Sequence, residues 1–139
     1  MILLDTNIAS ALGDHQSNPA VVNWFNTTDL DDMYLCSPVI SEIAYGAERA
    51  RLKHGLTRHQ EALNRLMAAF LNRILPFTTE CATTARRLRA YRASIGRPVA
   101  PPDMMIAAIA LHNNMTLATR NIRDFDGLDV KLVNPFETV

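Results

Sequence analysis

The feature that most constrains the fold is a regular alternation between short apolar segments and longer segments with helix signals. The apolar segments cover residues 2–4, 33–36, 74–77, 117–119 and 130–133. Between them lie helix-start pairs such as Asn18-Pro19 and Ser37-Pro38, and a helix-stop glycine at Gly55. Strands joined through helices of about ten or more residues pair in parallel through right-handed crossovers. The sequence therefore predicts a three-layer α/β/α sandwich around a central, mainly parallel sheet of four to five strands.

The same signals predict where the helices begin and end. Helices are expected over residues 8–12, from 19 to about 26, from the Ser37-Pro38 pair to 54, from 57 onward, between Thr79 and Gly96, and from 103 to 113. Thr6 or Asn7 is expected to cap the first of these, Ser37 the third and Thr79 the fifth, because such side chains accept hydrogen bonds from free helix N–H groups. No linker or repeat interrupts the chain, so a single domain is expected over residues 1–139.

Two classes of protein are disfavoured by the apolar pattern. The longest apolar run is shorter than the roughly 18 residues that suggest a membrane span. Residues 1–5 lack the basic start and the long apolar stretch of a signal peptide. A cytoplasmic protein without a membrane segment is therefore expected.

The formal net charge of zero hides a strong asymmetry along the chain. Residues 1–48 carry seven acids and no lysine or arginine, whereas residues 49–99 carry eleven bases and only two acids. Twelve of the fourteen bases are arginine, whose planar fork suits phosphate and carboxylate groups. A basic middle beside acid-bearing ends fits a metal-dependent enzyme that acts on nucleic acid. Solvated helix faces, or an acidic protein partner, would also account for this charge.

Three carboxylates follow predicted strands or begin predicted helices. Asp5 comes directly after the first strand, Glu42 lies in the helix after the second, and Asp103 lies in the first turn of an almost wholly apolar helix. Ligands of an open parallel sheet bind outside the carboxyl ends of its strands. Taken singly, Asp5 suits a turn and Asp103 suits a helix start. Glu42 is different, since a glutamate in an apolar helical stretch is costly unless it is paired or bound to metal.

Together, the three carboxylates predict a divalent metal site. Like charges in one place repel unless a cation lies between them, and oxygen ligands with open positions select Mg²⁺ or Mn²⁺. The chemistry that follows is metal-assisted hydrolysis of a phosphodiester. Asn121 and Asp124 follow the fourth strand and would reach the same edge, while Thr6 and Thr119 are candidates for hydrogen bonds that orient the carboxylates.

Four segments, in this order, resemble the PIN-domain family over essentially the whole chain. They are Leu-Asp-Thr-Asn at 4–7, Ser-Glu-Ile at 41–43, Pro-Asp-Met-Met-Ile-Ala-Ala at 102–108 and Thr-Arg-Asn-Ile-Arg-Asp-Phe at 119–125. Within the family, the chain length and Ser-Glu-Ile-Ala-Tyr-Gly at 41–46 are similar to VapC-type toxins of toxin–antitoxin systems. Arg-Ile-Leu-Pro-Phe at 73–77 and Asn-Pro-Phe at 134–136 are similar to the FitB-like branch.

The resemblance implies an endoribonuclease that depends on Mg²⁺ or Mn²⁺ and is the toxin of a type II toxin–antitoxin pair. It assigns Asp5, Glu42 and Asp103 to the metal-binding core, and Asn121 to a fourth position that is often aspartate. Because asparagine carries no charge, either Asp124 substitutes there or the site holds a single tightly bound ion. The implied partners are an RNA substrate, a cognate antitoxin and a second copy of the chain, with DNA bound only through the antitoxin complex.

Two other functions are weighed against the nuclease. The first is a PIN-like binding module that mainly complexes an antitoxin, binds DNA through it, and has little or no nuclease activity. The second is a phosphatase with an aspartate nucleophile after the first strand. That chemistry usually needs a second aspartate two residues further on, where this chain has Asn7.

Overall fold

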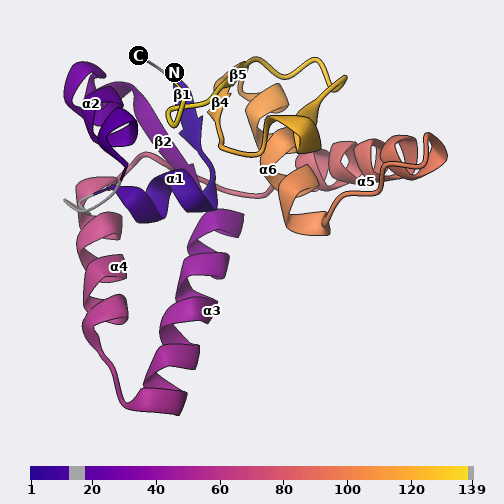
Figure 1. Ribbon diagram of the computed structural model, residues 1–139. Coiled ribbons are helices and arrows are strands. Elements are labelled where there is room, and N and C mark those ends of the chain that lie inside the picture. Colours follow the sequence, from indigo (N-terminus) through magenta and orange to yellow (C-terminus); the bar gives the residue numbers. More distant parts are fainter. Residues whose placement is uncertain (13–17, 138–139) are drawn as a thin grey trace.

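The computed structural model describes residues 1–12 and 18–137, which build a five-stranded sheet with helices on both sides (Figure 1). The strand order is β3-β2-β1-β4-β5, and every neighbouring pair is parallel. The strands are β1 (Ile2–Leu4), β2 (Met33–Cys36), β3 (Ile74–Leu75), β4 (Thr116–Ala118) and β5 (Leu132–Val133). The predicted α/β sandwich is confirmed, with a sheet that is parallel throughout.

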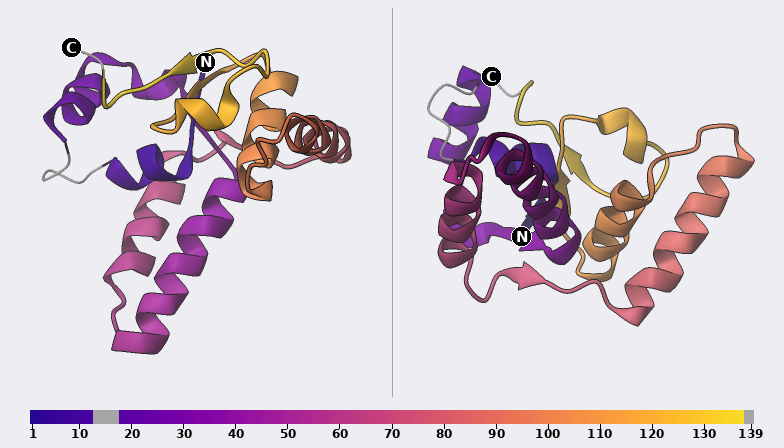
Figure 2. Two further views of the ribbon diagram at one scale, coloured as in Figure 1. Left: turned by 45° about the vertical axis from the view of Figure 1, so that its right-hand side comes forward. Right: turned by 90° about the horizontal axis from the view of Figure 1, so that it is seen from below.

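The helices occupy two layers and one projecting arm. They are α1 (Thr6–Ala11), α2 (Pro19–Thr27), α3 (Ser37–His54), α4 (Arg58–Ala69), α5 (Thr79–Ser94) and α6 (Pro101–His112), with 3₁₀ turns η1 (Leu30–Asp32) and η2 (Ile122–Phe125). Helices α5 and α6 lie on one side of the sheet, and α1 and α2 on the other (Figures 1 and 2). Helices α3 and α4 form a hairpin that extends away from the sheet. Gly55 ends α3 in the left-handed conformation, with φ of 65°, as its position predicted.

Asp5, and not Thr6 or Asn7, caps α1. Strand β1 ends at Leu4, and Asp5 still has the extended backbone that a cap position requires. Its carboxylate Oδ1 accepts a hydrogen bond from the N–H of Ile8 at 2.9 Å. The cap prediction is therefore wrong by one or two residues, and the acid that follows the strand is also the group that caps the helix.

Two further caps were predicted one residue too late. Cys36 is the residue before α3, and the hydroxyl of Ser37 accepts a hydrogen bond from the N–H of Phe77 at 3.0 Å instead of capping the helix. Thr78, not Thr79, caps α5. In both places the chain is extended up to the helix, so the last extended residue takes the cap position. The structure gives Ser37 a different task, which is to tie α3 to the segment after β3.

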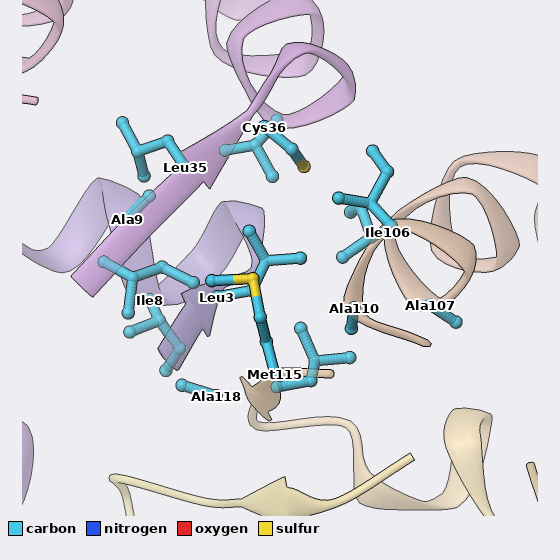
Figure 3. Close-up of a cluster of buried hydrophobic side chains, with 14 of the residues drawn as sticks. Leu3, Ile8, Ala9, Leu35, Cys36, Ile106, Ala107, Ala110, Met115 and Ala118 are labelled. Carbon is cyan, nitrogen blue, oxygen red and sulfur yellow. The ribbon is translucent and has the colours of Figure 1, made fainter. Parts of the chain in front are cut away.

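The core holds the sheet against α1 on one side and α6 on the other. Leu3, Leu35 and Ala118 from the strands lie with Ile8 of α1 and Ile106 of α6 in one buried cluster (Figure 3). Helix α6 is apolar almost all round, and residues 106–110 are fully or almost fully buried. A helix that is apolar on every face is stable only inside the protein. Its first turn is therefore held in a fixed place beside the ends of the strands.

Across residues 1–12 and 18–137, none of the helices is both long and apolar enough to pass through a bilayer.

Candidate functional site

Four of the five predicted site residues line one cleft of about 270 Å³. The N-terminal ends of α1, α3 and α6 lie near one another below the sheet (Figure 1), and residues at or near these ends line the cleft. Its lining residues come from the ends of β1 and β4 and from these helices: Asp5, Thr6, Asn7, Glu42, Ala100, Pro102, Asp103 and Asn121. Residues far apart in the sequence thus meet at the carboxyl edge of the sheet, where ligands of such folds bind.

Asp5 is the most deeply buried acid of the cleft, with 6% of its surface exposed. Its backbone N–H continues the sheet by donating to the carbonyl of Ala118 at 3.0 Å. Burial raises the pKa of this carboxyl, and the charge of Glu42 raises it further, although hydrogen bonds from Thr119 and from the N–H of Ile8 act in the opposite direction. Asp5 is therefore a fixed carboxylate that is held by donors on two sides.

Glu42 is positioned by a hydroxyl from another helix. The Oγ1 of Thr6, in α1, donates to Glu42 Oε2, in α3, at 2.6 Å. A short bond of this kind to a carboxylate is charge-assisted and stronger than a neutral one. The two residues are 36 positions apart along the chain. The bond therefore joins α1 to α3 and holds the Glu42 carboxylate in place on one side of the cleft.

Asp103 is the acid of the cleft whose pKa is raised most clearly. Burial raises the pKa of its carboxyl to about 6, and the charges of Asp124, Glu42 and Asp5 add to the rise. It is half-buried and lies in the first turn of α6, where the helix N-terminus favours negative charge. Burial and repulsion between acids therefore both favour the protonated form of Asp103.

Asn121 and Asp124 share the 3₁₀ turn that follows β4, as predicted. The N–H of Asp124 donates to the carbonyl of Asn121 at 3.0 Å, and the N–H of Asn121 donates to Thr119 Oγ1 at 3.0 Å. Asn121 lines the cleft, whereas Asp124 contributes mainly by its charge beside Asp103. Thr119 is fully buried, and it links this turn to Asp5.

Arg92 supports the site from behind, and the sequence analysis missed it. Only 2% of Arg92 is exposed, and its guanidinium donates to the carbonyls of Arg97, Asp126 and Arg123 at 3.1, 3.0 and 3.2 Å. It thereby joins α5 to the turn that carries Asp124. Helical spacing could have revealed it, because Cys81, Ala85, Leu88 and Arg92 recur every three or four residues on the inner face of α5.

The donor set of the cleft suits a hard divalent cation. Asp5, Glu42, Asp103 and Asp124 form no ion pair with any basic group in the described part of the chain, so their charge is not neutralised. Carboxylate oxygens, with the amide oxygen of Asn121, are ligands that Mg²⁺ and Mn²⁺ prefer. Over the same residues, no three His, Cys, Asp or Glu side chains form a ready-made metal site. The residues fit such an ion by their chemistry and their charge.

Comparison with known proteins finds similar proteins both by sequence and by structure. A family model described as PIN domain matches residues 2–131. The chain is 34% identical over 139 residues to Toxin FitB of Neisseria gonorrhoeae, which covers 98% of this chain and 99% of FitB. It is 28% identical over 138 residues to VapC ribonuclease Y4jK of Sinorhizobium fredii, with 99% of each chain covered. The solved structure of FitAB bound to an IR36 DNA fragment superposes with a TM-score of 0.86 and 33% identity, covering 100% of this chain and 98% of that one.

Proposed function

Because this chain belongs to the PIN domain family, we propose that it is an endoribonuclease and the toxin of a type II toxin–antitoxin pair. The observation that carries the proposal is the cleft at the carboxyl edge of the sheet. There, four acids from distant parts of the chain interact electrostatically and have no basic partner among the described residues. Repulsion of this kind destabilises a protein unless the site serves to bind a cation.

The proposed reaction is hydrolysis of an RNA phosphodiester. Asp5, Glu42 and Asp103 would hold Mg²⁺ or Mn²⁺, and the bound ion lowers the pKa of a water and offsets the charge that develops on the phosphate. Asn121 offers a neutral oxygen to the cleft, and Asp124 adds negative charge beside Asp103. The negative charge that Asn121 lacks is thus supplied by Asp124, which lies beside Asp103. Thr6 and Thr119 keep the carboxylates of Glu42 and Asp5 in place.

The test is cleavage of a structured RNA pool by the purified, partner-free chain. We expect cleavage with Mg²⁺ or Mn²⁺, and its loss when EDTA removes the ion. Full cleavage in EDTA would contradict the metal-dependent mechanism. No cleavage by a folded protein with metal would contradict the nuclease and favour the binding module. The DNA-bound structure of FitAB is the observation that keeps this second function open.

Replacing Thr6 with valine is expected to reduce cleavage by roughly ten- to a hundredfold with little loss of stability. The change removes the hydroxyl that holds Glu42 at 2.6 Å and keeps the shape of the side chain. The measurement is the cleavage rate at several Mg²⁺ concentrations. Thr83→Val is the matched control, because the Thr83 hydroxyl contacts only its own helix. Wild-type rates in Thr6→Val would show that the cleft does not need this hydrogen bond.

The proposed partners are a cognate antitoxin and a second copy of the chain, with DNA bound only through the antitoxin complex. FitAB, whose toxin is similar over almost the whole chain, was solved on DNA as such a pair. Co-expression with the product of the adjacent gene should give a complex that binds operator DNA. The chain alone should leave that DNA unbound.

A further inference from the structure

A second hollow, of about 320 Å³, lies along the outer flank of α5. One wall consists of residues one or two turns apart on α5, and the other is the segment that returns from α5 to α6 (Figures 1 and 2). The lining residues are Arg86, Arg89, Ala90, Ala93, Pro98 and Val99. Since the two alanines have short side chains, the hollow is a shallow groove bordered by two guanidinium groups. It is called the basic groove below.

Arg86 and Arg89 are available for a ligand. Both are exposed, and neither forms a hydrogen bond, an ion pair or a ring contact within residues 1–12 and 18–137. Many other arginines are engaged: Arg51 pairs with Glu48, for example, and Arg92 is buried against carbonyls. Two free guanidinium groups on one wall of a groove form a cationic site with the planar donors that suit phosphate.

The basic groove and the acidic cleft are adjacent along the chain. Val99 lines the groove, and the next residue, Ala100, lines the cleft. Val99 lies four residues before Asp103, so their Cα atoms are at most about 14 Å apart. Pro98, Pro101 and Pro102 restrict the backbone of this connection, which keeps the two hollows in a constant relation.

We propose that the basic groove binds the sugar–phosphate backbone of the RNA on one side of the bond that is cut. This inference rests on the proposed nuclease function and assigns the arginines that hold the substrate. The three acids of the cleft, with Asp124 beside them, repel phosphates, so a polynucleotide needs cationic groups nearby to bind there. Contacts to phosphates position the strand without reading its sequence. Arg86 and Arg89 are therefore binding residues that act on any RNA long enough to span both hollows.

The experiment compares two double variants with the same change in net charge. Arg86→Gln with Arg89→Gln removes the guanidinium groups of the groove. Arg65→Gln with Arg87→Gln is the control, because Arg65 is an exposed residue of α4 and Arg87 lies on the other flank of α5, within 3.4 Å of Thr84 Oγ1. The measurements are kcat and KM for a single-stranded RNA of about 16 nucleotides, with Mg²⁺, between about 50 and 200 mM salt.

The groove variant is expected to raise KM about tenfold and to leave kcat within about twofold, because phosphate contacts away from the cut bond contribute uniform binding. Its salt dependence should also weaken, with the slope of log(kcat/KM) against log[salt] smaller by about 1.4, or 0.7 for each lost phosphate contact. The control variant should keep the KM and the slope of the wild type. This pattern supports the proposal.

Three results would overturn it. Equal changes in both double variants would assign the effect to overall charge, and an unchanged KM in the groove variant would remove the groove from the RNA path. An altered oligomeric state with an unchanged KM would make the groove a contact between copies of the chain. In all three, the wild type still cuts RNA, so the proposed function survives. Failure of the wild type to cut any RNA would instead overturn that function, and this inference with it.

Discussion

Replacing Asp103 with asparagine is expected to abolish RNA cleavage and also to stabilise the metal-free protein. Asp103 would lose its charge as a metal ligand, and removing such a group costs at least about a hundredfold in rate. The second effect follows from burial and the three neighbouring acids, which together raise the pKa of Asp103 to about 6 from an ordinary value of 3.8. At pH 7 the ionised carboxylate lowers the free energy of unfolding by about 1–3 kcal/mol, which the neutral amide recovers.

The pH dependence of this difference has a definite direction. Between pH 3.8 and about 6 the folded wild type binds more protons at Asp103 than the unfolded chain does. Its stability therefore falls as the pH rises through this window, whereas the asparagine variant has no such group to titrate. Urea unfolding in EDTA at about pH 4 and at pH 7 measures both states. The stability advantage of Asp103→Asn should be present at pH 7 and almost absent at pH 4.

Asp31→Asn is the matched control for this experiment. Asp31 is exposed in η1, away from the cleft, so its replacement should change neither the cleavage rate nor the stability by more than about 0.5 kcal/mol. Asp103→Asn that remains active would remove Asp103 from the site. An inactive variant that is also less stable than the wild type at pH 7 would show that the acids of the cleft do not repel as described.

Replacing Arg92 with methionine is expected to give the largest loss of stability, about 3–5 kcal/mol. Methionine fills much of the same space but donates no hydrogen bond, so the carbonyls of Arg97, Asp126 and Arg123 lose a buried donor. Since two of these carbonyls lie at the turn that carries Asp124, cleavage should fall as well. Urea unfolding gives the stability, and cleavage at a temperature where the variant is folded gives the activity.

Two further variants distinguish the contribution of the planar guanidinium group of Arg92 from that of its positive charge. Arg92→Lys keeps the charge but cannot reach three carbonyls with one planar group, so it should lose most of the same stability. Arg97→Gln removes an exposed guanidinium whose ion pair with Asp126 spans 3.8 Å, and it should cost less than about 1 kcal/mol. A loss below about 1 kcal/mol in Arg92→Met would mean that water replaces the guanidinium at these carbonyls.

The sequence predicts the fold and the acids of the cleft because both follow from local patterns. Strands β1 and β2 are short apolar runs, and their ends fix where Asp5 and Glu42 must lie in a parallel sheet. The apolar helix α6 likewise places Asp103 in its first turn. These signals are local in sequence. Because the sheet is buried on both faces, the strands can pair in only one arrangement that keeps their apolar side chains inside.

Other features depend on contacts that no local pattern encodes. Asp5 caps α1 in place of Thr6 because its backbone remains extended at the end of the strand, and Thr6 then becomes the donor to Glu42. Arg92 lies among eleven bases in residues 49–99, so its charge does not distinguish it from the exposed ones. Helical spacing places it on the inner face of α5, but only the packing shows which carbonyls it contacts and that, within the described residues, Arg86 and Arg89 are free.

The position of β1 in the middle of the sheet has a consequence for the synthesis of this chain. Residues 2–4 pair with β2 on one side and with residues 116–118 on the other, so β1 cannot complete its pairing until β4 has been synthesised. Long-range parallel pairing of this kind folds slowly, because a long loop must close before the contact forms. Of the acids in the cleft, Asp5 directly follows β1, and Asp103 lies in α6, the helix that precedes β4. A chain that lacks β4 therefore lacks one of the two neighbours of β1 in the sheet and the turn that carries Asn121 and Asp124.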